Sequence, residues 1–293
     1  MLQIDYSKIP GKIWMNGNFI DTKNAKIHIL SHSLHFASAV FEGIRIYNSQ
    51  PFLIDKHLKR FEKSARILDY RIPFKLEKIK KICEKIIKIN KLSDGYLRPI
   101  AWRGTESMAP VNLDSKIGVA IAGWKWPVYY SADAKKNGIS LCLSKWKRPP
   151  AFTAPGESKC SGLYQICTLA KHEADRKGFD DAIMLDIESN ITETTSSNIF
   201  FIRDNTIYTP KINNFLNGIT RQTIIKLIKK NNFSFKEKKI NKDELNKFES
   251  AFITGTACEV TPINKINAKK LNTKNNLVLK LIDQFDILKK KNV

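Results

Sequence analysis

The sequence is short of acidic residues, paired cysteines and long apolar runs. No stretch approaches the roughly 20 apolar residues that a membrane-spanning helix needs, and the first residues lack the basic start and apolar segment of a secretory signal peptide. We therefore expect a cytoplasmic protein. The cysteines are dispersed, odd in number and without a C-x-x-C pair, which excludes a disulfide framework and a cysteine-rich zinc site. They are Cys83, Cys142, Cys160, Cys167 and Cys258.

Acidic residues are outnumbered, with 28 Asp and Glu against 50 Lys and Arg in 293 residues and a formal net charge of +22. Such an excess suits a nucleic-acid-binding protein, because clustered cations release counterions from phosphates. The lysines of residues 75–91, however, are interleaved with an apolar helical stripe and so form the wet face of a helix. A basic nucleic-acid-binding protein without catalysis stays an alternative, and the charge also suits attraction of small anionic substrates.

Strands and helices are expected in separate runs, which predicts an α+β protein rather than a strictly alternating one. An Asn16-Gly17 turn predicts a hairpin, and helices are expected over 56–69 and 76–90. The remaining strands expected in the first half cover residues 39–47, 51–54, 95–103 and 117–126.

We place a small N-terminal domain at residues 1–125, an interdomain loop at 126–138 and a larger domain at 139–293. In the larger domain a helix follows Lys159, another covers 219–231, and the chain ends in a polar, lysine-rich tail. The strands expected there cover residues 139–146, 181–187, 197–203, 206–208 and 250–254.

Lys159 lies among small residues, whereas the other lysines are scattered over polar stretches. It precedes a helix and then a short apolar run typical of a buried strand. A surface lysine is the ordinary alternative, since lysines are almost always exposed.

Two segments suit an anion. Gly218, Ile219 and Thr220 open a helix, whose unpaired amides and dipole favour negative charge. The segment from Thr254 to Ala257 follows an apolar strand and offers a glycine, hydroxyls and amides. Arg60, on a predicted helix, is a candidate cation for the same ligand.

Glu193 follows a predicted strand and its turn, among small hydroxyl residues. A lysine, an anion site and a carboxylate are the groups that a protein supplies to pyridoxal 5′-phosphate: an amine for the Schiff base, an anchor and a partner for the pyridine nitrogen. The combination therefore predicts a pyridoxal phosphate enzyme.

The ordered motifs also resemble those of a known family. FEGIR (41–45), HLKRFEKSA (57–65), YLRPIAWRGTESM (96–108), the stretch 159–186, LNGITR (216–221) and TGTACEVTP (254–262) are similar to the class IV, fold type IV, pyridoxal phosphate enzymes, and among them to branched-chain amino acid aminotransferases. The resemblance covers nearly the whole chain. It implies the two-domain fold of D-amino acid aminotransferases, with a small N-terminal α/β domain and a larger domain around a β-barrel-like core.

The resemblance implies a ping-pong transfer of the amino group from L-leucine, L-isoleucine or L-valine to 2-oxoglutarate, in branched-chain amino acid biosynthesis. Lys159 would bind the cofactor covalently and act as general base, Tyr164 would bond its phenolic oxygen, and Glu193 its ring nitrogen. The residues expected to hold the phosphate are Arg60, Ile219, Thr220 and Thr256. The family is normally at least dimeric, so a homo-oligomer is expected.

For the substrate, the resemblance implies that Tyr96 and the amides of Thr256 and Ala257 hold the α-carboxylate. Arg98 would receive the distal carboxylate of glutamate. An apolar side-chain pocket would be walled by Phe36, Phe41, Trp126 and Tyr129.

The chain departs from the family pattern at three places. Thr194 to Ser197 add hydroxyls after Glu193, Phe36 replaces a tyrosine, and Met108-Ala109-Pro110 replaces a Met-Gly-Val type loop. These differences concern specificity more than chemistry, and an aminotransferase of D-amino acids or other amines is the alternative within the fold. His28 and His32 suggest one helix face, but no acidic partner or cysteine is near them in sequence, so no metal site is expected.

Overall fold

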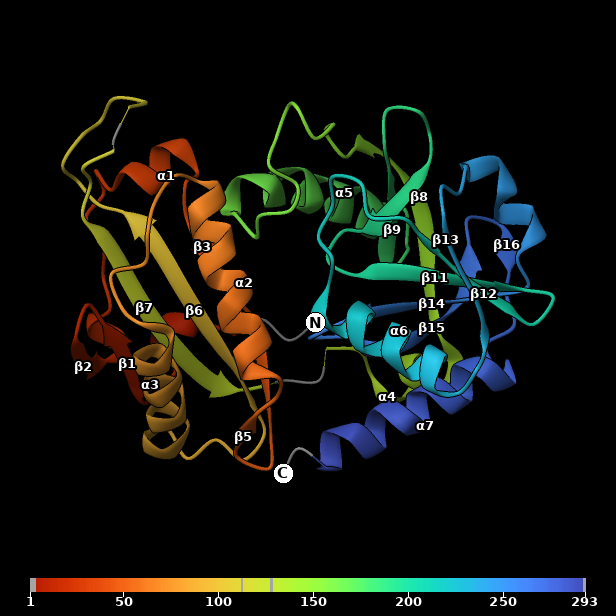
Figure 1. Ribbon diagram of the computed structural model, residues 1–293, viewed down its shortest axis with the longest axis horizontal. Coiled ribbons are helices and arrows are strands. Elements are labelled where there is room, and N and C mark those ends of the chain that lie inside the picture. The colour runs from red at the N-terminus through yellow and green to blue at the C-terminus, as the bar shows by residue number, and fades with distance from the viewer. Residues whose placement is uncertain (1–3, 112, 127–128, 292–293) are drawn as a thin grey trace. The chain divides into compact units, whose positions relative to one another are not determined.

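The computed structural model describes residues 4–111, 113–126 and 129–291, which form two compact units (Figure 1). The first unit is Met1–Tyr129, Ser158–Gly162 and Lys289–Val293, and the second is Tyr130–Glu157 and Leu163–Leu288. The segment around Lys159, which we expected in the larger domain, therefore groups with the first unit. The predicted interdomain loop contains a short helix, α4 (Ala132–Asn137), and its residues 127 and 128 lie outside the described residues.

The first unit is built on a seven-stranded antiparallel sheet in the order β2-β1-β7-β6-β4-β5, with β3 beside β6. The Asn-Gly hairpin is confirmed, because both turn residues have the positive φ that such a turn requires. The strands are β1 (Lys12–Met15), β2 (Asn18–Asp21), β3 (Val40–Phe41), β4 (Ile44–Tyr47), β5 (Gln50–Pro51), β6 (Gly95–Arg103) and β7 (Ile117–Lys125).

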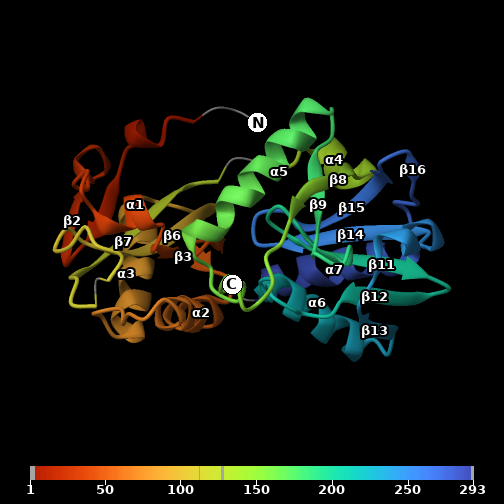
Figure 2. The same cartoon turned by 90° about the horizontal axis from the view of Figure 1, so that it is seen from above.

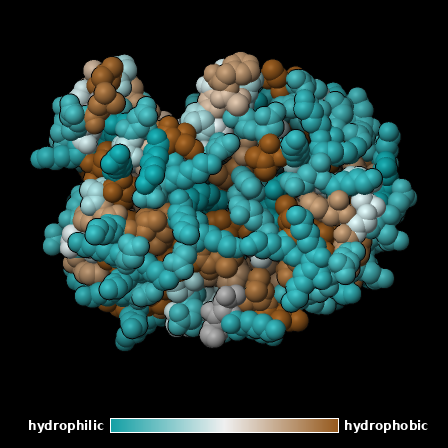
Figure 3. All heavy atoms as spheres, in the orientation of Figure 1, coloured by the Kyte–Doolittle hydropathy of each residue, from teal (hydrophilic) through white to brown (hydrophobic). Residues whose placement is uncertain are grey.

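Three helices accompany this sheet: α1 (His32–Phe36), α2 (Ile54–Ile67) and α3 (Leu76–Ile89), with short 3-10 turns at Tyr6–Lys8 and Thr22–Asn24. The apolar stripe of α3 is buried, including Ile79, Ile82 and Ile86. Its lysines face outward, and hydrophilic side chains cover most of the face shown in Figure 3. The interpretation of residues 75–91 as a solvated helix is confirmed.

The strand predicted over 39–47 is broken into β3 and β4, because Glu42 and Gly43 separate them. The Glu42 side chain is fully buried. A Cβ at Gly43 would lie 1.7 Å from the Tyr96 hydroxyl oxygen, so only glycine fits there. The predicted strand over 51–54 is also wrong, since β5 ends at Pro51 and α2 begins at Ile54.

The second unit is built on a nine-stranded mixed sheet in the order β10-β9-β8-β15-β14-β11-β12-β13, with β16 beside β15. The sheet curls, so that β8 and β11 run in crossing directions (Figure 1). Its strands are β8 (Ile139–Lys147), β9 (Asp181–Leu185), β10 (Ile191–Thr194), β11 (Asn198–Arg203), β12 (Thr206–Pro210), β13 (Ser234–Lys238), β14 (Ser250–Gly255), β15 (Glu259–Ile266) and β16 (Lys269–Lys270).

Helices α5 (Tyr164–Arg176) and α6 (Ile219–Lys230) pack on this sheet, α5 lying along β8 and β9 (Figure 2). Short 3-10 helices span Ser161–Leu163 and Lys242–Lys247. The predicted polar tail is wrong: β15 is a buried central strand, and α7 (Asn276–Lys291) buries Val278, Leu281 and Phe285. Helix α7 is amphipathic, and its lysines lie outside the buried apolar stripe. The high lysine content of this segment led to the prediction of a polar tail.

The two sheets and their segregated helices confirm the α+β class. Among the described residues, no helix is both long enough and apolar enough to cross a membrane.

Candidate active site

Lys159 is held between β3 and α2 of the first unit. Cys160 forms an antiparallel β-bridge with Val40, and the amide of Phe41 donates to the carbonyl of Lys159 at 3.1 Å. The Lys159 amide donates to Ser64 Oγ at 3.0 Å. These contacts exclude the ordinary alternative of a loop lysine in solvent, because both faces of its backbone are bonded to secondary structure.

The amine of Lys159 lies in surroundings that disfavour its charge. Its Nζ is 4.9 Å from the centroid of the Phe41 ring. Burial lowers the pKa of Lys159 to about 8, and the neighbouring Arg60 guanidinium lowers it further, against the opposing effect of Glu42. An amine of this kind is partly uncharged near neutral pH and suits a nucleophile or a base.

Glu42 is a site residue that the sequence analysis missed. Its carboxylate accepts from Arg60 Nε at 2.6 Å and Nη2 at 2.9 Å, and lies 2.7 Å from His57 Nδ1. Burial alone would raise the pKa of Glu42, but Arg60 and His57 outweigh it and hold the pKa well below its usual range. The signal in the sequence was a single acidic residue inside an otherwise apolar strand-like run.

The expected substrate residues of the first unit lie in two groups. Tyr96 stacks on Trp126 with ring centroids 4.3 Å apart, and Trp126 on Tyr129 at 6.2 Å. The Arg98 guanidinium lies 4.8 Å from the Phe41 centroid and 5.6 Å from that of Tyr96. These five residues, on β3, β6 and the segment after β7, are therefore linked by side-chain contacts within one unit.

Arg98 Nε is buried and has no hydrogen-bond partner within the described part of the chain. Phe36 differs from the other aromatic residues. It lies in α1, is 41% exposed and stacks on His32 at 4.5 Å between ring centroids. The shared helix face proposed for the histidines is wrong, because His28 lies outside α1. No cluster of three potential metal ligands occurs among the residues that the structure describes.

In the second unit, Glu193 lies within β10, a strand that was not predicted, and pairs with Met184 of β9. It is buried, and its Oε1 lies 3.5 Å from Nε of Arg148, which is itself 4% exposed. Arg148 Nη1 lies 3.7 Å from the sulfur of Cys167. Arg148 was missed, although an arginine between a strand and two prolines marks a strand end.

The hydroxyls that follow Glu193 are used by the fold. Thr195 donates to Asp181 at 2.6 Å, and Thr194 Oγ1 donates to the carbonyl of Ser197 and accepts from its amide, at 3.2 Å each, within a tight turn. Burial raises the pKa of Asp181, while the Thr195 bond opposes this effect. The hydroxyl residues that depart from the family pattern after Glu193 therefore form hydrogen bonds that hold this part of the second unit together.

The first anion segment opens α6, as predicted. Asn198 holds the turn before it, because its Oδ1 accepts from the amide of Gly218 at 3.0 Å and its Nδ2 donates to the carbonyl of Leu216 at 2.9 Å. Ile219 and Thr220 begin the helix, and amides in a first turn have no partner inside the helix. This arrangement presents donors to an anion.

The second anion segment is the tight loop between β14 and β15. It carries Thr256 and Ala257, and a Cβ at Gly255 would lie 2.9 Å from Ser197 Oγ. At the end of β14, Thr254 Oγ1 is buried without a hydrogen-bond partner among the described residues. Tyr164 begins α5 and packs on the buried cluster around Cys167.

These residues fit pyridoxal phosphate by their chemistry. The first unit holds an amine with a lowered pKa beside a cation, and the second holds a buried carboxylate and two glycine-containing segments whose amides suit a phosphate.

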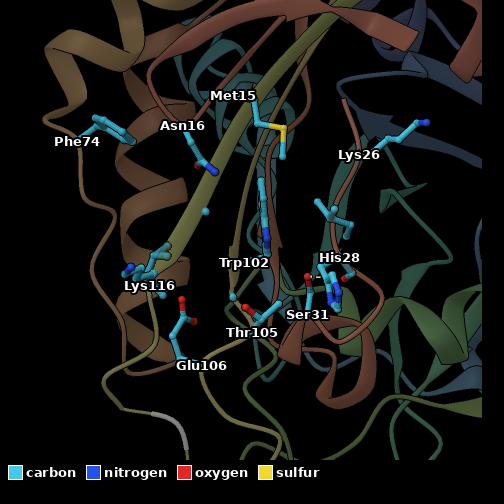
Figure 4. A pocket seen from close by; sticks show the side chains of 14 residues that line it. Met15, Asn16, Lys26, His28, Ser31, Phe74, Trp102, Thr105, Glu106 and Lys116 are labelled. Atoms are coloured by element: carbon cyan, nitrogen blue, oxygen red, sulfur yellow. Dashed lines mark hydrogen bonds between the residues drawn. The ribbon is translucent and has the colours of Figure 1, made fainter. Parts of the chain in front are cut away.

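A separate hollow lies elsewhere on the first unit (Figure 4). It has a volume of about 460 Å³, and Trp102 lies at its centre. The residues predicted for catalysis or binding do not line it, so it is distinct from the site described above.

The comparisons with known proteins agree with this chemistry. A family model described as amino-transferase class IV matches residues 39–266. A probable branched-chain-amino-acid aminotransferase of Rickettsia felis is 38% identical over 267 residues, which cover 91% of this chain and 91% of the relative. That of Pseudomonas aeruginosa is 36% identical over 265 residues, covering 89% and 86%. The branched-chain amino acid aminotransferase from T.th., in a crystal structure with pyridoxamine 5′-phosphate, superposes with a TM-score of 0.93 at 34% identity and covers 98% of this chain and 96% of that one.

Proposed function

The chain belongs to the class IV aminotransferase family, and from this we propose that it transfers the amino group of L-leucine, L-isoleucine or L-valine to 2-oxoglutarate, and the reverse, in branched-chain amino acid biosynthesis. Like its family, it is a transaminase that depends on pyridoxal phosphate. The observation that carries the proposal is the buried amine of Lys159, whose pKa is lowered to about 8 by burial and by Arg60.

The following roles toward the cofactor are proposed. Lys159 would bind its aldehyde carbon, Tyr164 its phenolic oxygen and Glu193 its ring nitrogen. The phosphate would be bound by Arg60, Ile219, Thr220 and Thr256. The buried Glu193 carboxylate beside Arg148 supports this assignment, because a carboxylate can accept a hydrogen bond from a protonated ring nitrogen.

When bound, pyridoxal phosphate supplies an aldehyde that takes up the amino group and a protonated ring that accepts the electron pair from Cα. Lys159 acts as general base and moves the Cα proton. With a pKa of about 8, the Lys159 amine is uncharged in roughly a tenth of the molecules at pH 7. The uncharged amine can accept the proton, and the protonated amine is acidic enough to give it up again. The Phe41 ring, whose centroid lies 4.9 Å from the amine, adds an apolar surface beside it.

The substrate is proposed to be bound through its carboxylate by Tyr96 and by the amides of Thr256 and Ala257. Arg98 would receive the distal carboxylate of glutamate, and the buried Nε without a partner supports this role. An aliphatic side chain would lie among Phe41, Trp126, Tyr129 and Phe36. Burial against such rings stabilises a leucine side chain by about 2 kcal/mol.

We also infer a homo-oligomer, a dimer at least, and a cytoplasmic location. Large apolar side chains are exposed on α1 and on the segment after β6, as on a surface that a second copy covers: Leu34, Phe36, Met108, Val111 and Leu113. All five cysteines are buried free thiols, which suits a reducing compartment.

The absorption spectrum of the protein with pyridoxal phosphate tests the function. Wild type is expected to be yellow, and borohydride is expected to attach the cofactor permanently to Lys159. Lys159→Ala should lose both properties, and its activity should fall by at least about a thousandfold. Lys265→Ala is the matched control, because Lys265 also lies over a phenyl ring, 4.8 Å from the centroid of Phe179. Borohydride labelling at another lysine would contradict the assignment.

A substrate panel tests the specificity. We expect activity with L-leucine, L-isoleucine and L-valine and 2-oxoglutarate, and none with D-alanine. Activity confined to D-amino acids would identify the alternative within the fold.

A further inference from the structure

The carboxylate of Glu42 is fully buried and surrounded by hydrogen-bond donors. Its two oxygens accept four hydrogen bonds: two from Arg60, one from His57 and one from the amide of Gly43 at 3.2 Å. Oε1 accepts one of them and Oε2 the other three. A buried carboxylate with so complete a set of donors is held in one orientation.

The charges in this group balance without His57. Burial lowers the pKa of His57 against the opposing effect of Glu42, and Arg60 and Lys159 lower it further, which favours a neutral imidazole whose Nδ1 faces Glu42. The negative charge of Glu42 then offsets the positive charge of Arg60. Charge repulsion on the nearby Lys159 amine is smaller than it would be beside an isolated guanidinium.

Glu42 also fixes where Arg60 points. The guanidinium is planar, and the edge formed by Nε and Nη2 donates to the Glu42 carboxylate. Fixing that edge fixes the direction of the rest of the group. Arg60 lies in the middle of α2, and a long side chain there would otherwise sample several rotamers.

We propose that Glu42 is a positioning residue, which orients the Arg60 guanidinium and offsets its charge so that Arg60 can bind the phosphate of the cofactor. The inference rests on the proposed function, which brings a phosphate to Arg60. It adds to that function a residue that touches neither cofactor nor substrate but determines how well the phosphate is held.

The test separates the phosphate from the rest of the ligand. Binding of pyridoxamine 5′-phosphate and of pyridoxamine to the cofactor-free full chain is measured by titration calorimetry; neither ligand bonds covalently to Lys159. The ratio of the two dissociation constants gives the contribution of the phosphate. We expect Glu42→Gln to weaken the binding of pyridoxamine 5′-phosphate by about tenfold and that of pyridoxamine by less than about threefold. The reason is that the variant impairs a charge-assisted contact that only the phosphate makes.

Glu62→Gln is the matched control, since it removes the same charge from α2 at an exposed position, where Glu62 pairs with Arg66 at 3.2 Å. Its ratio is expected to equal that of wild type. A Glu42→Gln ratio equal to that of wild type would overturn the proposal, as would equal weakening of both ligands.

A second pair of variants keeps the test valid if Glu42→Gln folds poorly with Arg60 left unpaired. Arg60→Met and the double variant Glu42→Gln/Arg60→Met are expected to have the same ratio, because Glu42 has nothing left to orient. A further loss in the double variant would contradict an action through Arg60. If wild type and Glu62→Gln bind neither ligand, the proposed function itself fails, and the inference fails with it.

Discussion

At the scale of single residues, Lys159 is a buried amine with a stability cost. Its folded pKa of about 8 lies below the ordinary value of 10.5, so the unfolded chain binds more protons between these two values. The free energy of unfolding contributed by this group therefore rises with pH from about 8 to 10.5. Below pH 8 the cost is at most about 3 kcal/mol.

Lys159→Met removes that cost. Without cofactor, the variant is expected to unfold at higher urea than wild type at pH 7, and the difference is expected to shrink as the pH approaches 10.5. Urea unfolding across this range measures it. A difference that does not change with pH would show that packing of the methionine, and not the charge, is responsible.

Arg148 is the second residue for which the structure makes a prediction. Arg148→Met leaves the buried carboxylate of Glu193 without its nearest cation. Removing one partner of a buried ion pair costs about 3 kcal/mol, and we expect this loss in the free energy of unfolding. Cofactor affinity should fall as well. Arg203→Met, at a more exposed pair with Asp204, is the control and should change either quantity little.

At the scale of secondary structure, the turn before α6 depends on one side chain. Asn198, on β11, makes both hydrogen bonds that hold Leu216 and Gly218. Asn198→Ala should therefore lower the free energy of unfolding by about 2 kcal/mol and weaken binding of pyridoxamine 5′-phosphate. Urea unfolding and calorimetry measure the two effects. The exposed Asn213→Ala serves as control, and equal effects of both variants would rule out a specific role of the turn.

The elements show what a sequence can reveal. Helix α3, strand β6 and the β1–β2 hairpin were predicted nearly to their ends, because each has its own periodicity or turn residues. The break at Glu42 was not predicted, since its carboxylate is satisfied by Arg60 and His57 of α2, which only the folded chain brings to it. For the same reason, the partner of Glu193 was missed: Arg148 is 45 residues away in sequence.

The site residues divide in the same way. Lys159, Arg60 and Thr220 were proposed from their own surroundings in sequence and from the family motifs. Ser64, Glu42 and Asn198, which hold the segments or side chains of these residues, lie on distant elements and carry no local pattern. Motifs therefore pointed to the residues proposed to meet the ligand and not to those that hold them in place.

At the scale of the whole molecule, the exposed apolar residues on α1 and after β6 predict an assembly. Leu34 is 54% exposed and Val111 74% exposed, and both belong to the first unit. Leu34→Glu/Val111→Glu should shift the mass measured by analytical ultracentrifugation toward that of one chain, because charges cannot be buried at an apolar interface. Phe152→Glu, at a residue that is 89% exposed in the second unit, is the control. A wild-type protein that sediments as a single chain would contradict the prediction.

The path of the chain has a consequence for synthesis. Residues 158–162 belong to the first unit, although both flanking segments belong to the second. A nascent chain that has emerged only as far as Tyr129 therefore lacks the neighbour that Cys160 provides for Val40, and it lacks the reactive amine altogether. A fragment that ended at that tyrosine would thus contain the whole sheet of the first unit but not all of the unit's chain.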